Sequence, residues 1–253
     1  MNMQIKKRHL EVDGLKTSYF EAGEGENLIF FDGLFSSVVV CGSFIKELSK
    51  KYKVYALDLP GFGGTETPKE IWSIDDYADF VLNFTDAFKI KKPIVCACSA
   101  GCLIGINLAF KNKIKKLILV DSAGLKLPFS KRELFFRLFV VKTLKELILF
   151  RRFPRVSMMM LLNLREVVKG IFNRKIKKII EKNIEVSYEK ELKNIKIPVT
   201  IIWGEDDEIL SLDYARRLNK LIKNSKLIIV KGNHDWLVLE YEQAGKLVKE
   251  GLI

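Results

Sequence analysis

The chain has 253 residues, of which 48% are hydrophobic, and a formal net charge of +12. This length and apolar content allow one large buried core, so a single main domain is expected. Uninterrupted apolar runs all fall short of the ~20 residues that a membrane-spanning helix requires. The positive charge comes with none of the usual recognition motifs for nucleic acids, so we do not expect nucleic-acid binding.

From the N-terminus onward, the chain alternates between predicted strands and helices. Residues 1–10 lack the apolar core of a signal peptide, which predicts a protein that stays in the cytoplasm, and His9 within them is expected at the surface. Short, continuous apolar runs are typical of buried parallel strands. Six such runs are present, at residues 28–31, 54–57, 94–98, 117–120, 199–203 and 227–230.

Helical segments are expected between these strands. Ser73 is a predicted capping residue followed by an acidic first turn, and residues 212–223 and 237–249 have helical spacing of apolar side chains. Strands and helices in alternation predict an α/β fold with a mostly parallel, doubly wound sheet.

More than 70 residues separate the strand that ends near Asp121 from the one that starts at Pro198, too many for one crossover helix. We predict a helical cap at residues 125–194, inserted into a core formed by residues 1–124 and 195–253. The cap sequence is rich in Phe, Leu and Met.

Residues 126–196 contain 19 Lys and Arg against 7 Asp and Glu, an excess equal to the net charge of the whole chain. This basic segment could hold an anionic substrate, touch an acidic membrane surface, or form a solvated face.

Residues 97–101, Ala-Cys-Ser-Ala-Gly, lie between a predicted strand and a predicted helix. This context is typical of a nucleophile elbow centred on Ser99. A serine hydroxyl is a poor nucleophile unless a base can reach it, and a tight strand-to-helix turn exposes it to such a base. Gly101 satisfies the steric demand of the turn, whereas Ala97 stands where glycine is commoner.

An acid and a base follow two later strands. Asp207 comes after residues 199–203, and His234 comes after residues 227–230. The chain order is therefore Ser, Asp, His, with Ser99 as nucleophile, His234 as general base and Asp207 orienting the imidazole. Asp206 and Asp121 remain alternative positions for the acid.

With these residues, the chain resembles the α/β-hydrolase fold superfamily over nearly its whole length, as a serine-nucleophile, esterase- or lipase-like member with a cap. Further segments that carry the resemblance are residues 27–34, 58–65, 204–207 and 232–234, together with an opening hairpin in the first fifty residues. The resemblance implies an oxyanion hole made by the backbone N–H groups of Ala100 and Leu34. Asp32 replaces the usual histidine of the oxyanion loop, and we expect its side chain to turn away and bond loop amides or a cation.

The resemblance implies a hydrolase of carboxylic esters or thioesters with a hydrophobic acyl group, acting through an acyl-enzyme. One alternative is a carbon–carbon bond hydrolase of the meta-cleavage product type, which shares the triad and a comparable cap. A second is a ligand-binding protein on the same fold that performs no reaction. No cofactor and no metal are expected, and the oligomeric state is left open.

Two further groups of residues are expected to be structural. The cysteines are interpreted as small buried apolar side chains rather than metal or disulfide sites: Cys41, Cys96, Cys98 and Cys102. Asp58 and residues 61–64 are expected to shape a loop, because no Gly-Lys-Ser or Gly-Lys-Thr follows them and a phosphate-binding P-loop is thereby excluded.

Overall fold

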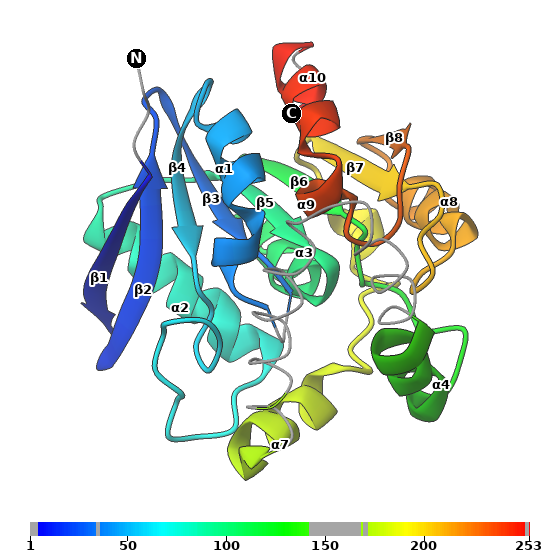
Figure 1. Cartoon of the computed structure of the whole chain (residues 1–253), viewed down its shortest axis with the longest axis horizontal. Coiled ribbons are helices and arrows are strands. Elements are labelled where there is room, and N and C mark those ends of the chain that lie inside the picture. Colours follow the sequence, from blue (N-terminus) through cyan, green and yellow to red (C-terminus); the bar gives the residue numbers. More distant parts are fainter. Residues whose placement is uncertain (1–4, 34–35, 142–167, 169–171, 251–252) are drawn as a thin grey trace.

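The computed structural model describes residues 5–33, 36–141, 168, 172–250 and 253, and its centre is an eight-stranded sheet (Figure 1). The strand order is β1-β2-β4-β3-β5-β6-β7-β8. The strands are β1 (Lys6–Val12), β2 (Leu15–Ala22), β3 (Glu26–Phe31), β4 (Tyr52–Leu57), β5 (Ile94–Cys98), β6 (Lys116–Val120), β7 (Val199–Gly204) and β8 (Ser225–Val230). The hairpin of β1 and β2 joins β4 in antiparallel fashion, and the other neighbours are parallel.

The six predicted apolar runs coincide with β3 to β8, which confirms the predicted α/β fold. Continuous apolar runs were the correct signal because helices cover both faces of this sheet. Every residue of β5 and β7 is buried. His9, on the edge strand β1, is exposed as expected.

Helices pack on both faces of the sheet (Figure 1). One apolar layer contains residues of α1 (Gly42–Leu48), α9 (Trp236–Leu239) and α10 (Tyr241–Lys249). The other contains residues of α2 (Ile74–Ala87), α3 (Cys102–Phe110) and α8 (Leu212–Leu221). The predicted start of α2 is confirmed, because Ser73 and Asp76 form a reciprocal capping box.

The C-terminal helix prediction was partly wrong. Residues 237–249 do not form one helix, because Glu240 leaves helical geometry with φ −115° and ψ 39° and separates α9 from α10. Helix α8 ends at Leu221, two residues before the predicted end, and its C-cap Ile222 is extended. Apolar spacing continues through both points, so the pattern alone cannot locate these ends.

The segment between β6 and β7 is helical wherever the structure describes it in regular form. It contains α4 (Lys131–Phe136), a π-helical turn (Arg137–Val141), α7 (Arg174–Asn183) and a 3-10 turn (Leu192–Asn194). In α7, Ile176, Ile179 and Ile180 pack into the core layer that α2 and α3 share. The Met-rich residues 158–160 of the predicted cap lie outside the described residues, and the boundaries of the cap stay a prediction.

None of the described helices is long and apolar enough to cross a membrane. The cytoplasmic location stays a prediction.

Candidate active site

Ser99 lies on a sharp turn between β5 and α3. Its φ is +49°, a left-handed backbone conformation that is uncommon for residues other than glycine. Cys98, just before it, is extended, and the chain turns through residues 99–101 into α3. The turn is tight at Gly101, where a Cβ atom would lie 2.5 Å from the carbonyl oxygen of Asp32. The predicted elbow geometry is therefore present.

Ala97, which stands where glycine is commoner, lies across from Gly105 of α3. A Cβ atom on Gly105 would lie 3.5 Å from the Ala97 Cβ and 2.8 Å from Leu117 Cδ1. The glycine lets α3 lie close to the Leu117 side chain of β6, whereas the distance to Ala97 is an ordinary van der Waals contact. Ala97 itself is fully buried. The methyl group at this position therefore leaves the turn intact.

Asp207 lies in the turn after β7, and both of its carboxylate oxygens accept hydrogen bonds. Oδ1 accepts from the backbone N–H groups of Ile209 at 2.7 Å and Leu210 at 2.9 Å. Oδ2 accepts from His234 Nδ1 at 2.8 Å. Loop amides therefore fix the carboxylate, and its other oxygen orients the imidazole.

His234 connects Asp207 to Ser99, since its Nε2 lies 3.1 Å from Ser99 Oγ. With the ring proton on Nδ1, Nε2 is the acceptor for the serine hydroxyl. The side chains of His234 and Asp207 are only 6% and 0% exposed. The three predicted residues thus form one hydrogen-bonded chain, in which the acid and the base are shielded from water and Ser99 is partly exposed.

The turns that carry the acid and the base are joined through their backbones. The N–H groups of Glu205 and Asp206 donate to the carbonyls of Val230 and Gly232 at 2.9 and 3.0 Å. A Cβ atom on Gly204 would lie 2.6 Å from the Gly232 oxygen, so the close crossing requires glycine there. Asp206 is exposed and does not form part of the Ser99–His234–Asp207 chain, which favours Asp207 over it as the acid.

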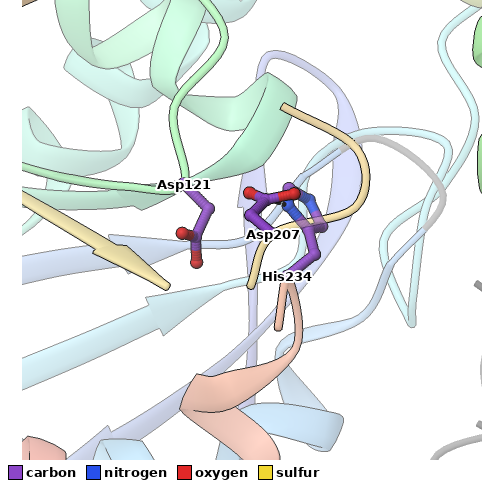
Figure 2. Close-up of side chains that lie close together, drawn as sticks. All are labelled: Asp121, Asp207 and His234. Carbon is purple, nitrogen blue, oxygen red and sulfur yellow. Dashed lines mark hydrogen bonds and ion pairs between the residues drawn. The ribbon is translucent and has the colours of Figure 1, made fainter. Parts of the chain in front are cut away.

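Asp121, the other alternative acid, follows β6 and is 2% exposed. One carboxyl oxygen of Asp121, one of Asp207 and one ring nitrogen of His234 lie within 4.8 Å of one another (Figure 2). Three such ligands could in principle hold a metal ion. However, His234 Nδ1 donates to Asp207, whereas a metal needs a free lone pair on that nitrogen. We interpret the group as a support of the imidazole.

Around Ser99, the geometry of the predicted oxyanion hole is described in part. Ala100 follows the nucleophile at the start of the helical segment, where N–H groups have no intrahelical acceptor. A Cβ atom on Gly33 would lie 3.2 Å from Ser99 Cβ and 3.5 Å from both the Ala100 nitrogen and Ser99 Oγ, so the glycine lets its loop lie close to the nucleophile turn. Leu34, the other predicted donor, lies outside the described residues.

Asp32 turns into its own loop, as expected from the sequence. Its Oδ1 accepts from the Gly33 N–H at 2.7 Å, and its Oδ2 accepts from the Ser36 hydroxyl at 2.6 Å. The carboxylate therefore shapes the loop that follows β3.

Asp58 ties this loop to the one after β4. Its carboxylate accepts from Ser37 Oγ, the Val38 N–H and the Gly64 N–H at 2.9 to 3.0 Å. Both oxygens of this buried carboxylate thus bond groups of the two loops, which agrees with the predicted structural role.

All four cysteines are free and buried. Burial raises the pKa of each thiol, for Cys102 to about 12. Strand alternation directs Cys96 and Cys98 to the layer with Cys41, whereas Cys102 lies in the other layer. The thiols are therefore apolar core groups, as predicted.

Gly33, beside the nucleophile, belongs to the motif after β3 that the sequence already indicated. Two other contributions were not predicted: Gly105 against Leu117, and the indole of Trp236 near Asp121. Both depend on packing between separate elements, for which a single chain offers no signal.

Comparisons with known proteins agree with this fold. The family model of the α/β-hydrolase fold matches residues 26–149. An uncharacterized hydrolase, YugF, of Bacillus subtilis is 25% identical over 87% of this chain and 88% of its own. The monoacylglycerol lipase ABHD6 of Bos taurus is 22% identical over 95% of this chain and 79% of its own. The solved structure of the meta-cleavage product hydrolase CumD from Pseudomonas fluorescens has a TM-score of 0.78 at 22% identity, covering 96% of both chains.

Proposed function

We propose that this chain, which belongs to the α/β-hydrolase fold superfamily, is a serine hydrolase that cleaves carboxylic esters or thioesters with a hydrophobic acyl group. The observation that carries the proposal is the continuous hydrogen-bonded chain from Asp207 Oδ2 through His234 to Ser99 Oγ, at 2.8 and 3.1 Å. A serine, an imidazole and a fixed carboxylate in this geometry are the components of nucleophilic acyl transfer.

In the proposed reaction, Ser99 Oγ attacks the acyl carbonyl while His234 Nε2 takes the hydroxyl proton. The tetrahedral intermediate collapses, and His234 gives that proton to the departing alcohol or thiol. Water then attacks the acyl-enzyme with the same base, which releases the acid and restores Ser99. Throughout, Asp207 holds the imidazole in the tautomer that leaves Nε2 free to accept.

We assign the stabilisation of the negative charge that develops on the carbonyl oxygen to backbone N–H groups. The Ala100 amide is the first donor, because it adjoins Ser99 at the start of a helix, where the dipole also favours negative charge. Leu34 stays the proposed second donor. We place the scissile carbonyl against Ser99 and Ala100, on the side that Gly33 faces.

The acyl preference is drawn from the cap. Its sequence combines Phe, Leu and Met side chains, and flexible Met side chains suit acyl groups of several shapes. The similarity to a monoacylglycerol lipase is consistent with such a substrate. The excess of Lys and Arg in the cap also suits contact with an acidic membrane surface.

A second candidate is hydrolysis of a carbon–carbon bond. It is favoured by the similarity to the meta-cleavage product hydrolase and by the basic cap, which could hold an acidic dienoate. Both reactions would use Ser99 and His234, so the site geometry does not separate them. A synthetic dienoate substrate assayed beside the esters would do so.

The direct test is hydrolysis of p-nitrophenyl esters from acetate to laurate by the wild type and by the Ser99→Ala and Ser225→Ala variants. Ser225 is the matched control, because it lies at the opposite end of the sheet and bonds the carbonyls of Asn219 and Ile222. We expect Ser99→Ala to lose about three orders of magnitude or more in kcat and Ser225→Ala to retain activity.

Equal activity in the wild type and Ser99→Ala would contradict the proposed nucleophile. Turnover of the dienoate alone would replace ester hydrolysis by the second candidate. If no substrate is turned over, labelling with a fluorophosphonate distinguishes two cases. An enzyme tested with the wrong substrates would still be labelled at Ser99, whereas a protein that only binds ligands would not, because only an activated serine reacts.

A further inference from the structure

Asp121 links the ends of two neighbouring strands beneath the proposed active site. Its backbone N–H donates to the Ile202 carbonyl at 3.1 Å, and its Oδ1 accepts from the Gly204 N–H at 2.9 Å. Gly204 begins the turn that carries Asp207, whose N–H donates back to the Gly204 carbonyl at 3.3 Å. The carboxyl group of Asp121 is therefore the side-chain anchor of the acid-bearing turn.

The other carboxyl oxygen of Asp121, Oδ2, lies in a buried environment that disfavours a negative charge. Asp121 is 2% exposed, and Oδ2 has no hydrogen-bond partner among the described residues. The buried indole N–H of Trp236 is a nearby donor that acts on this carboxyl group, although the contact between them falls outside hydrogen-bond geometry. An ionised carboxylate with an unpaired buried oxygen would be costly, whereas the neutral acid avoids most of that cost.

The charged and titratable groups that face Asp121 act in different directions. Burial raises the pKa of Asp121 well above its usual range, and the nearby charge of Asp207 raises it further. His234 lowers it, as do the Gly204 N–H and the Trp236 indole. The Cys102 thiol of α3 also faces it and remains protonated, since burial raises its pKa to about 12. Desolvation is the largest of these effects, which favours the neutral form.

We propose that Asp121 is a positioning residue: its uncharged carboxyl group holds the Gly204 end of the turn that carries Asp207, and leaves Asp207 as the one charged carboxylate beside His234. Figure 2 shows the three side chains reaching this point from separate connections of the sheet. The catalytic consequence rests on the proposed hydrolase function, whereas the protonation state of Asp121 does not.

Two substitutions separate the anchor from the charge. Asp121 has φ +45°, a conformation that both asparagine and glycine tolerate, so neither Asp121→Asn nor Asp121→Gly strains the backbone. Asparagine is uncharged and keeps an oxygen that can accept from Gly204, whereas glycine removes the anchor. We expect Asp121→Asn to retain kcat within about threefold, and Asp121→Gly to lose about tenfold or more in kcat with little change in KM.

The pH profile adds a readout that a purely structural role would not move. If Asp121 is uncharged, the acidic limb of kcat/KM for Asp121→Asn superimposes on that of the wild type. If Asp121 were charged, its loss would make protonation of His234 less favourable and shift the limb to lower pH. A shift of about one unit or more would therefore overturn the proposal.

Carbon-13 NMR of the Asp121 carboxyl group in the Ser99→Ala protein tests the same point without any turnover. We expect the chemical shift of a protonated acid at neutral pH, with Asp121→Asn identifying the resonance by its loss. The shift of an ionised carboxylate would overturn the proposal even if the ester assays succeeded. Conversely, a wild type inactive on every substrate would contradict the proposed function and leave the NMR result to decide the state of Asp121.

Discussion

Gly101 and the carbonyl group of Asp32 lie so close that a Cβ atom on the glycine would come within 2.5 Å of that oxygen. The nucleophile turn and the loop after β3 are therefore packed backbone against backbone. This contact holds the loop after β3 against the turn that carries Ser99 and Ala100.

Gly101→Ala should force these two segments apart. Because the clash is with a backbone oxygen, we expect a loss of about 1 to 3 kcal/mol in the free energy of unfolding together with a lower kcat. Gly42→Ala is the matched control, since a Cβ atom there meets nothing within 4 Å. Thermal melts and ester hydrolysis measure both effects, and an unaffected Gly101→Ala would show that the contact is not required.

Asp207→Asn should abolish most of the activity, whereas Asp206→Asn should not. Loss of the charged acceptor for His234 Nδ1 favours the wrong tautomer, and we expect kcat to fall by about four orders of magnitude. Asp206→Asn should remain close to the wild type, because the exposed Asp206 side chain lies outside the chain of hydrogen bonds to Ser99. Retained turnover in Asp207→Asn, with loss in Asp121→Asn, would move the acid to Asp121.

Asp32→His, which restores the residue usual in related loops, should not improve the reaction. The Asp32 carboxylate already holds the Gly33 N–H and the Ser36 hydroxyl, so an imidazole would have to replace both bonds. We expect equal or lower kcat/KM on the best ester. A gain of about an order of magnitude would mean that the carboxylate opposes the developing oxyanion.

The wild type should lose stability relative to Asp121→Asn as the pH rises. The pKa of Asp121 is raised in the folded protein, so the folded state binds this proton more tightly than the unfolded state. The stabilisation is complete below the unfolded pKa and is lost as pH rises toward the folded pKa, at no more than about 1.4 kcal/mol per unit. Asparagine has no proton to lose. Denaturant melts of both proteins between these two pKa values measure the effect. If the pKa of Asp121 were not raised, the two free energies of unfolding would differ by the same amount at every pH.

Thiol reagents should not react with the native protein. The four cysteines are buried and their thiols have raised pKa values, so few thiolates form and access is blocked. We expect no rapid reaction with a disulfide reagent in the native state and four equivalents after denaturation. Rapid labelling of even one thiol in the native protein would contradict the assigned burial.

The sequence predicted the sheet because each central strand is a short apolar run, and it predicted the reacting residues because Ser99, Asp207 and His234 each follow such a run. Parallel strands bring their carboxyl ends to one edge, so three local signals sufficed for a site formed over long distances.

Other features could not be predicted because they depend on contacts across the fold. The close approach of Gly105 to Leu117 joins a helix to a strand that it packs on, and the break at Glu240 interrupts an otherwise regular apolar pattern. Asp121 was recognised only as an alternative acid, since its bond to Gly204 spans 83 positions.

Ser99 and His234 are 135 positions apart, and His234 follows the strand at one edge of the sheet. During synthesis, the base therefore cannot meet the nucleophile until β8 has left the ribosome and paired with β7. A nascent chain that has already folded the elbow around Ser99 would still be inert toward esters, because its serine has no partner to accept the proton. Hydrolytic activity is thus expected to be among the last properties that the growing polypeptide acquires.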